Sequence, residues 1–152
     1  MMELIDKITI KSKPDKIWDT LVFFFQNPEN YRLWHKDHIS CYWKKGKEFS
    51  PGSVLISKEY IHGSKHRLGL RIQSIKKDNL VEYKMLFPFS ILCSGGTFKM
   101  VIKVDESEFI AQLKFRYGLL LKLLFKKQVK GLKDHMREEG QNLKRIVEDQ
   151  NN

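Results

Sequence analysis

The sequence predicts an α+β fold in which a curved antiparallel sheet of six to seven strands packs around a long C-terminal helix. Stretches with strand-like composition follow one another through the middle of the chain, without the crossover helices that a parallel sheet needs. Two short helical segments follow the first strand, and helical spacing returns from about Leu119 to Glu148. Such a sheet must cover its apolar face, and only the last helix is long enough to do so. We therefore expect a cavity between the sheet and this helix.

The elements at the N-terminus are predicted from alternation and from helix-start signals. Residues 3–10 alternate between apolar and polar side chains, which is typical of a strand. A helix is expected over residues 12–25, because Pro14 suits a first helical position. The dipeptide Asn27-Pro28 then opens a second short helix or helical turn.

Six strand-like stretches come next, each rich in β-branched or aromatic residues and bounded by turn residues. The segments KKDN and DESE are predicted to be hairpin turns, and the glycines of CSGGTF predict a turn or a bulge. The predicted strands cover residues 40–46, 53–63, 66–77, 80–87, 96–105 and 109–117.

Length and composition predict one globular domain over residues 1–150. A chain of 152 residues with 41% hydrophobic content can bury a substantial core. There is no run of about eighteen apolar residues, and Glu3 and Asp6 interrupt the N-terminus, so we expect neither a spanning helix nor a secretory signal. Cys41 and Cys93 lack a CxxC spacing, so we expect neither a disulfide framework nor a thiolate metal site. These features predict a cytoplasmic protein.

The chain is strongly basic, with a formal charge of +10, which favours partners that carry negative charge. No RNA-binding signature, zinc-finger spacing or helix-turn-helix pair is present, so we do not expect nucleic acid to be the partner. The lysines gather beside the stretch LLLKLLF, where they form either a solvated helix face or a segment that makes weak contact with an anionic membrane. A homodimer is compatible with the sequence. The clustered lysines are Lys122, Lys126, Lys127, Lys130 and Lys133.

The last helix contains a break in its apolar pattern. The spacing of the stripe calls for an apolar residue at position 139 or 140, but the sequence has Glu139 and Gly140, with His135 one turn earlier. Residues four apart project from the same helical face, so His135 and Glu139 are expected to point together into the cavity. A buried carboxylate needs a metal, a basic partner or a proton. A slight rotation of the helix would instead pair Glu139 with Lys133 at the cavity mouth.

The segment SKPDKIWDTLVFFFQNPENYRLW has a Pro shortly before a Trp and a Tyr-x-x-Trp after a helix break, and the strands and the long helix follow it. In this pattern the chain resembles the START-like helix-grip superfamily, also called SRPBCC, which includes polyketide cyclases and lipid-transfer domains. The resemblance covers nearly the whole chain and speaks to the fold more firmly than to the activity.

Within that superfamily the chain is similar to the diacetylphloroglucinol hydrolase type, in which two His and two Glu side chains hold a zinc ion in the cavity. The resemblance implies that WHKDH, ISKEY and HMREE supply these ligands as His38, Glu59, His135 and Glu139. His35 competes with His38 for the first place. We prefer His38 as the ligand, because it lies where the chain enters a cavity strand, and expect His35 to be a catalytic acid or base or a partner of the ligands.

The resemblance implies a metal-dependent hydrolase that acts on a small acylated phenolic or related hydrophobic substrate. The mixed nitrogen and oxygen donors suit Zn²⁺ best, and also Fe²⁺, Mn²⁺ or Co²⁺. The alternative is a non-catalytic carrier or sensor that binds a hydrophobic or aromatic ligand. In both cases we expect Tyr31, Trp34, Leu132 and Met136 to line the cavity. His62 and His66 are expected at a hairpin tip in solvent.

Overall fold

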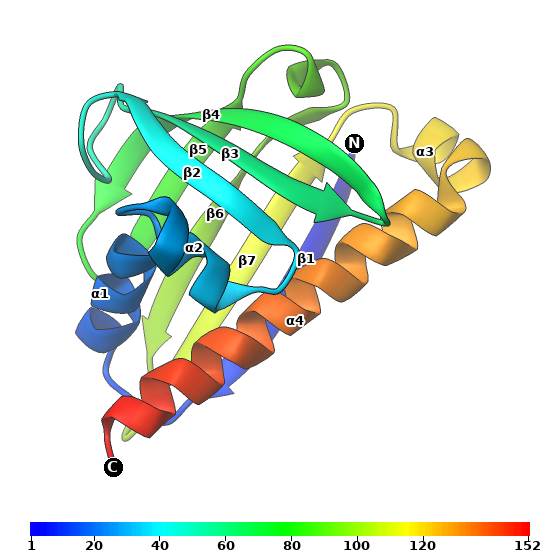
Figure 1. Ribbon diagram of the computed structural model, residues 1–152. Helices are drawn as coiled ribbons and strands as arrows, with labels where there is room; N and C mark the ends of the chain where they lie inside the picture. Colours follow the sequence, from blue (N-terminus) through cyan, green and yellow to red (C-terminus); the bar gives the residue numbers. More distant parts are fainter.

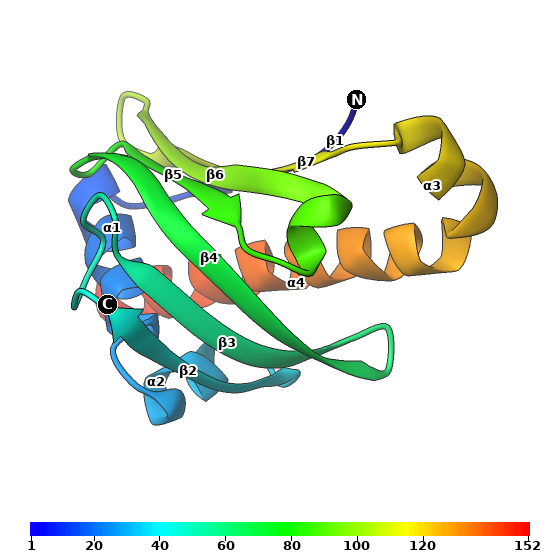
Figure 2. The ribbon, with the colours of Figure 1, turned by 90° about the horizontal axis from the view of Figure 1, so that it is seen from above.

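The computed structural model describes residues 1–152 and contains one seven-stranded antiparallel sheet, which curves over a long C-terminal helix (Figures 1 and 2). The predicted α+β architecture is therefore confirmed. The strands are β1 (Met2–Ile10), β2 (His38–Lys45), β3 (Val54–Ile61), β4 (Ser64–Lys76), β5 (Leu80–Met85), β6 (Cys93–Ile102) and β7 (Ser107–Phe115). The helices are α1 (Pro14–Phe24), α2 (Pro28–Trp34), the short 3₁₀ helix η1 (Phe89–Ile91), α3 (Gly118–Leu124) and α4 (Lys126–Gln150).

The order of strands across the sheet is β1-β7-β6-β5-β4-β3-β2. Strands that follow one another from β2 to β7 pair as neighbours, while β1 joins β7 over the register Met2↔Phe115 to Ile10↔Ser107. The pairing of β5, β6 and β7 is regular except near the start of β6. There the register shifts between Cys93 and Gly95, which agrees with the bulge expected in CSGGTF.

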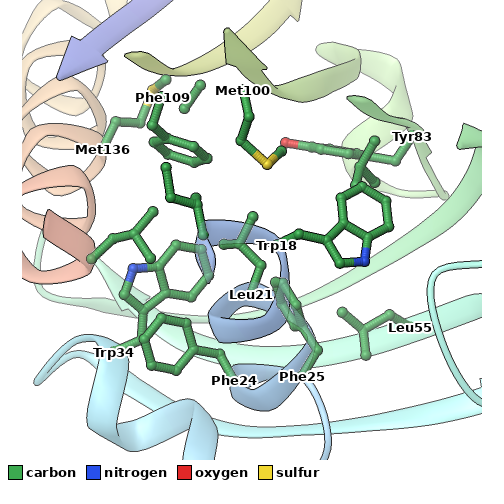
Figure 3. Close-up of a cluster of buried hydrophobic side chains, with 14 of the residues drawn as sticks. Trp18, Leu21, Phe24, Phe25, Trp34, Leu55, Tyr83, Met100, Phe109 and Met136 are labelled. Atoms are coloured by element: carbon green, nitrogen blue, oxygen red, sulfur yellow. The ribbon is translucent and has the colours of Figure 1, made fainter. Parts of the chain in front are cut away.

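Helices α1 and α2 begin where the sequence indicates. Pro14 occupies the first turn of α1, and the side chain of Asn27 caps α2 by accepting a hydrogen bond from the backbone N–H of Asn30 at 2.9 Å. Both helices bury aromatic side chains against the sheet, and the rings of Phe24 and Trp34 stack with centroids 5.1 Å apart. Figure 3 shows these rings in the same cluster as Met136 of α4.

The prediction of a single C-terminal helix from Leu119 to Glu148 is wrong in one respect. The chain forms two helices there, which meet at Phe125. The backbone of Phe125 leaves the helical region, with φ −122° and ψ 35°. This change of direction lets Leu121 pack into the core while the apolar stripe of α4 faces the sheet. None of the helices combines the length and the apolar character needed to cross a bilayer.

Candidate metal centre and ligand cavity

A cavity of about 390 Å³ lies between the sheet and α4. Twenty of its 29 lining residues are hydrophobic, a composition typical of sites for small apolar ligands. The lining residues come from α2, from β3 to β7, from η1, from α3 and α4, and from the ends of neighbouring elements. The four residues expected to line the cavity, Tyr31, Trp34, Leu132 and Met136, all lie in its wall.

The structure brings together the four side chains that the sequence singled out as metal ligands. His38 opens β2 and pairs in register with Glu59 of β3, which places the two on neighbouring strands. His135 and Glu139 lie one turn apart on α4. One donor atom from each of the four lies within 4.8 Å of the others.

One carboxylate oxygen lies at the centre of this group. Glu139 Oε1 is 2.8 Å from His38 Nε2 and 3.1 Å from His135 Nε2. Glu59 Oε2 approaches the same His38 nitrogen at 3.6 Å. The pairing of Glu139 with Lys133, which the sequence left open, does not occur, because the two imidazoles are the partners of this carboxylate.

Tyr31 orients two of the four donors. Its carbonyl oxygen lies 3.0 Å from His38 Nδ1, and a carbonyl can only accept, so Nδ1 carries a proton and Nε2 faces Glu139. Its hydroxyl donates to Glu59 Oε2 at 2.5 Å. Burial, followed by the charges of Glu59 and Glu139, raises the pKa of Tyr31 well above its usual value, so the hydroxyl keeps the proton that it donates.

The electrostatics of the site couple His135 to Glu139. Burial lowers the pKa of His135, but the hydrogen bond and the charge of Glu139 outweigh burial and raise the pKa to about 9. Burial opposes ionisation of Glu139, but His135 and then His38 hold the pKa of this carboxyl far below its usual range. In the absence of a metal, a proton on His135 therefore balances the charge of Glu139.

The donors fit a divalent cation. His38 Nδ1 donates to a carbonyl, so Nε2, which lies 2.8 Å from Glu139 Oε1, is the nitrogen that can hold either a proton or a cation. Tyr31 fixes the orientation of His38 and Glu59, because its carbonyl accepts from the first and its hydroxyl donates to the second, as is usual for the outer partners of metal ligands. Two imidazole nitrogens and two carboxylate oxygens form a set that Zn²⁺ commonly accepts.

Comparison with solved structures identifies the architecture. The chain superposes on TTHA0849 from Thermus thermophilus with a TM-score of 0.74 and 13% identity, over 96% of this chain and 97% of that chain. Norcoclaurine synthase from Thalictrum flavum gives a TM-score of 0.69 and 9% identity, over 96% and 86% of the two chains. The chain has the helix-grip fold. At these identities the likeness concerns the fold alone.

The ginseng major latex-like protein 151 from Panax ginseng shares the helix-grip architecture with a TM-score of 0.62 and 15% identity, over 88% of this chain and 96% of that chain. No protein-family profile matches the sequence, and no curated protein sequence matches it. The activity of this chain must therefore be inferred from the residues in the cavity between its sheet and α4.

His35 lies beside the four donors but is turned away from the cavity. Its Nδ1 accepts a hydrogen bond from the backbone N–H of Asp37 at 3.0 Å, so Nε2 carries the proton and donates to Glu138 Oε2 at 2.7 Å. Its ring lies 4.2 Å from that of His135, and it is not part of the cavity wall. Burial lowers the pKa of His35. The catalytic role expected for His35 stays a prediction, and its ring packs beside that of His135 without a hydrogen bond to it.

A second group of potential ligands consists of His35, Asp37 and His135. It shares His135 with the first group, so the two cannot use the same nitrogen at once. Both nitrogens of His35 already have hydrogen-bond partners. The first group is therefore the better candidate for a metal.

His62 lies exposed in the turn of the β3–β4 hairpin, as the sequence predicted, whereas His66 lies within β4 and is half-buried. Both also contribute to the cavity wall, which the sequence did not predict. The ring of His66 meets that of Phe89 at 5.3 Å. The hairpin register could have predicted the place of His66, because the tight turn at Gly63 pairs His66 directly with Glu59.

Proposed function

We propose that this protein is a metal-dependent hydrolase that acts on a small acylated phenolic or related hydrophobic molecule bound in its cavity. The observation that carries the proposal is the convergence of two imidazoles and two carboxylates from three elements. Glu59, His135 and Glu139 line the apolar cavity, and His38 lies outside its wall, within 2.8 Å of Glu139. His38, Glu59, His135 and Glu139 would hold Zn²⁺, with Fe²⁺, Mn²⁺ or Co²⁺ as alternatives.

Some residues around these donors would bind the ligand, and Tyr31 would position the metal-binding side chains. Trp34, Leu132 and Met136 contact the apolar part of the ligand and exclude water from it. Tyr31 keeps His38 and Glu59 oriented through its carbonyl and its hydroxyl. A bound divalent cation supplies Lewis-acid polarisation of an acyl carbonyl.

The substrate class has support from size and from one structural relative. A cavity of about 390 Å³ suits one small aromatic molecule with short substituents. The norcoclaurine synthase structure, which has the same fold, holds dopamine and hydroxybenzaldehyde, and both are phenols. An acylated phenol combines the ring that such a cavity accepts with the carbonyl that a Lewis acid activates.

Metal analysis of protein purified without chelator tests the proposal. We expect about one equivalent of metal in the parent protein and loss of it in His135→Ala and Glu139→Gln, because each removes one of four donors. His62→Ala is the matched control, since this histidine lies at the mouth and outside the donor group. Hydrolysis of acetylated phenols should disappear on chelation and return when Zn²⁺ is restored. A parent protein free of metal, or variants that keep it, would contradict the proposal.

A non-catalytic carrier or sensor is the second candidate, favoured by the largely apolar lining of the cavity. In that case the parent and Glu139→Gln should bind an apolar fluorescent dye equally well, and neither should hydrolyse any ester in the presence of added metal. Dye binding with metal-dependent turnover in the parent alone would exclude this candidate.

A further inference from the structure

Large apolar side chains are exposed around the mouth of the cavity. Leu119, Leu123 and Leu124 of α3 are 75, 72 and 67% exposed. Across the mouth, Phe87 just before η1 is 79% exposed and Ile91 within η1 is 53% exposed. Exposed apolar residues scattered singly are ordinary, but a group of them at the entrance to a ligand cavity indicates a surface that meets a partner. We call these five residues, together with Phe125, the apolar rim.

The two halves of the apolar rim belong to the same opening. Leu121 and Phe125 at the end of α3, and Phe89 and Leu92 of η1 and its flank, all line the cavity. In Figures 1 and 2, α3 lies at the end of the molecule opposite α1, beyond the C-terminal end of β7. A flat partner at this end would therefore cover the entrance to the cavity.

The chain segment that carries the α3 half of the apolar rim has charge of one sign only. No acidic residue occurs between Glu108 and Asp134, a segment that contains all of α3 and the first two turns of α4. The lysines of this segment include Lys122, Lys126 and Lys127, all of which are exposed. Lys130 does have a partner, because it lies 3.0 Å from Asp134. Exposed leucines flanked by unopposed lysines are typical of segments that bind an anionic lipid interface.

We propose that the apolar rim and its lysines dock the protein on an anionic lipid surface, with the mouth of the cavity facing the membrane. The leucines of α3 enter the region between headgroups and acyl chains, while Lys122, Lys126 and Lys127 contact the headgroups. A second copy of this chain is a poorer partner, since it would bring two lysine-rich surfaces together. Docking gives a hydrophobic ligand a path from the bilayer into the cavity without exposure to water, and it requires neither metal nor catalysis.

Vesicle co-sedimentation with the full chain tests this proposal. The parent should bind vesicles of phosphatidylcholine and phosphatidylglycerol at least about tenfold more tightly than phosphatidylcholine alone, and high salt should weaken the binding. Lys126→Glu/Lys127→Glu should lose about tenfold in affinity, whereas Lys44→Glu/Lys45→Glu, which makes the same charge change on β2, should keep most of it. Equal losses in the two variants would overturn the proposal, because net charge alone would then explain the binding.

The apolar contribution needs its own pair of variants. Leu123→Ser should weaken binding to the mixed vesicles at least about threefold, because the leucine leaves water only when it is docked. Leu33→Ser is the control, since Leu33 is 60% exposed but lies on α2. Circular dichroism checks that each variant is folded. Unchanged binding of Leu123→Ser would overturn the proposal, and so would a concentration-dependent dimer that Leu123→Ser abolishes in a protein that ignores vesicles.

Discussion

The two ends of the molecule use similar apolar residues in opposite ways. At one end, α1 and α2 pack against the sheet, and Phe24 and Leu21 are completely buried. At the other end, five of the seven residues of α3 are leucines, yet Leu119 and Leu123 lie largely in solvent. The first end, which we call the closed end, supplies stability because its side chains find partners. At the second, the open end, the same chemistry leaves an entrance and a surface.

The candidate donors lie where these two ends meet, and the closed end positions them. The indole N–H of Trp34 donates to the carbonyl oxygen of Glu139 at 3.0 Å, and the side chain of Asn142 donates to the carbonyl oxygen of Trp34 at 2.9 Å. Helix α2 is thereby bound to α4 at the turn that carries Glu139. A site supported from a rigid end and open toward a loosely packed end can hold its geometry while a ligand enters.

Truncation at the closed end should have the largest effect on stability. Phe24→Ala removes a fully buried ring that stacks on Trp34, and should cost about 3–5 kcal/mol in the free energy of unfolding. The matched change at the open end, Leu124→Ala, should stay within about 0.5 kcal/mol. Urea unfolding of both variants measures the difference, and similar losses would mean that the open end is packed as tightly as the closed one.

The rate at which the Cys41 thiol is alkylated should depend on pH in a way that reflects its burial at the closed end. Burial raises the pKa of Cys41 to about 11, and burial also raises the pKa of Cys93. Since only the thiolate reacts, Cys41 should be alkylated at pH 8 about a hundredfold more slowly than a thiol of ordinary pKa, and the rate should rise about tenfold per pH unit below its pKa. Mass spectrometry follows the reaction, with protein in denaturant as the control. Fast alkylation of Cys41 in the folded protein would contradict this burial.

Removal of the Tyr31 hydroxyl should affect the boundary between the two ends. Tyr31→Phe leaves the buried Glu59 without its donor, which should cost about 1–3 kcal/mol in stability. If the four donors hold a metal, its affinity should fall about 10- to 100-fold. Tyr42→Phe is the control, because its hydroxyl is exposed and accepts only from Arg67. Chemical unfolding and competition with a chromophoric chelator measure the two effects, and an unchanged Tyr31→Phe would show that this hydrogen bond orients nothing.

The smallest expected difference in stability between the two ends comes from the N-terminal caps of α2 and α3. Asn27→Ala removes the side-chain acceptor at the start of α2 and should cost about 1 kcal/mol. Helix α3 has no such cap, since Tyr117 precedes it with φ 54° and makes no side-chain hydrogen bond there. Tyr117→Gly should therefore leave stability unchanged or raise it slightly, because glycine adopts this backbone conformation without strain. A larger loss in Tyr117→Gly than in Asn27→Ala would reverse the comparison.

Much of this arrangement could be predicted from local patterns. Alternation and turn residues give the strands, and the spacing of four between His135 and Glu139 places both on one face of α4. The break at Phe125 could not be predicted, because a leucine-rich segment favours helix throughout and only packing of Leu121 fixes the change of direction. The different environments of His35 and His38 could not be predicted from the sequence either. Helix α2 ends at Trp34, and the extended backbone of His35 turns that ring away from the cavity.

The partnership of β1 with β7 has a consequence for how the protein is made. Residues 2–10 leave the ribosome well before residues 107–115, to which they hydrogen-bond. Until that late segment emerges, the nascent first strand lacks its only neighbour in the sheet. Completion of the sheet must therefore wait until most of this chain has been synthesised, and we expect it to be slow, as is common when pairing spans most of a chain.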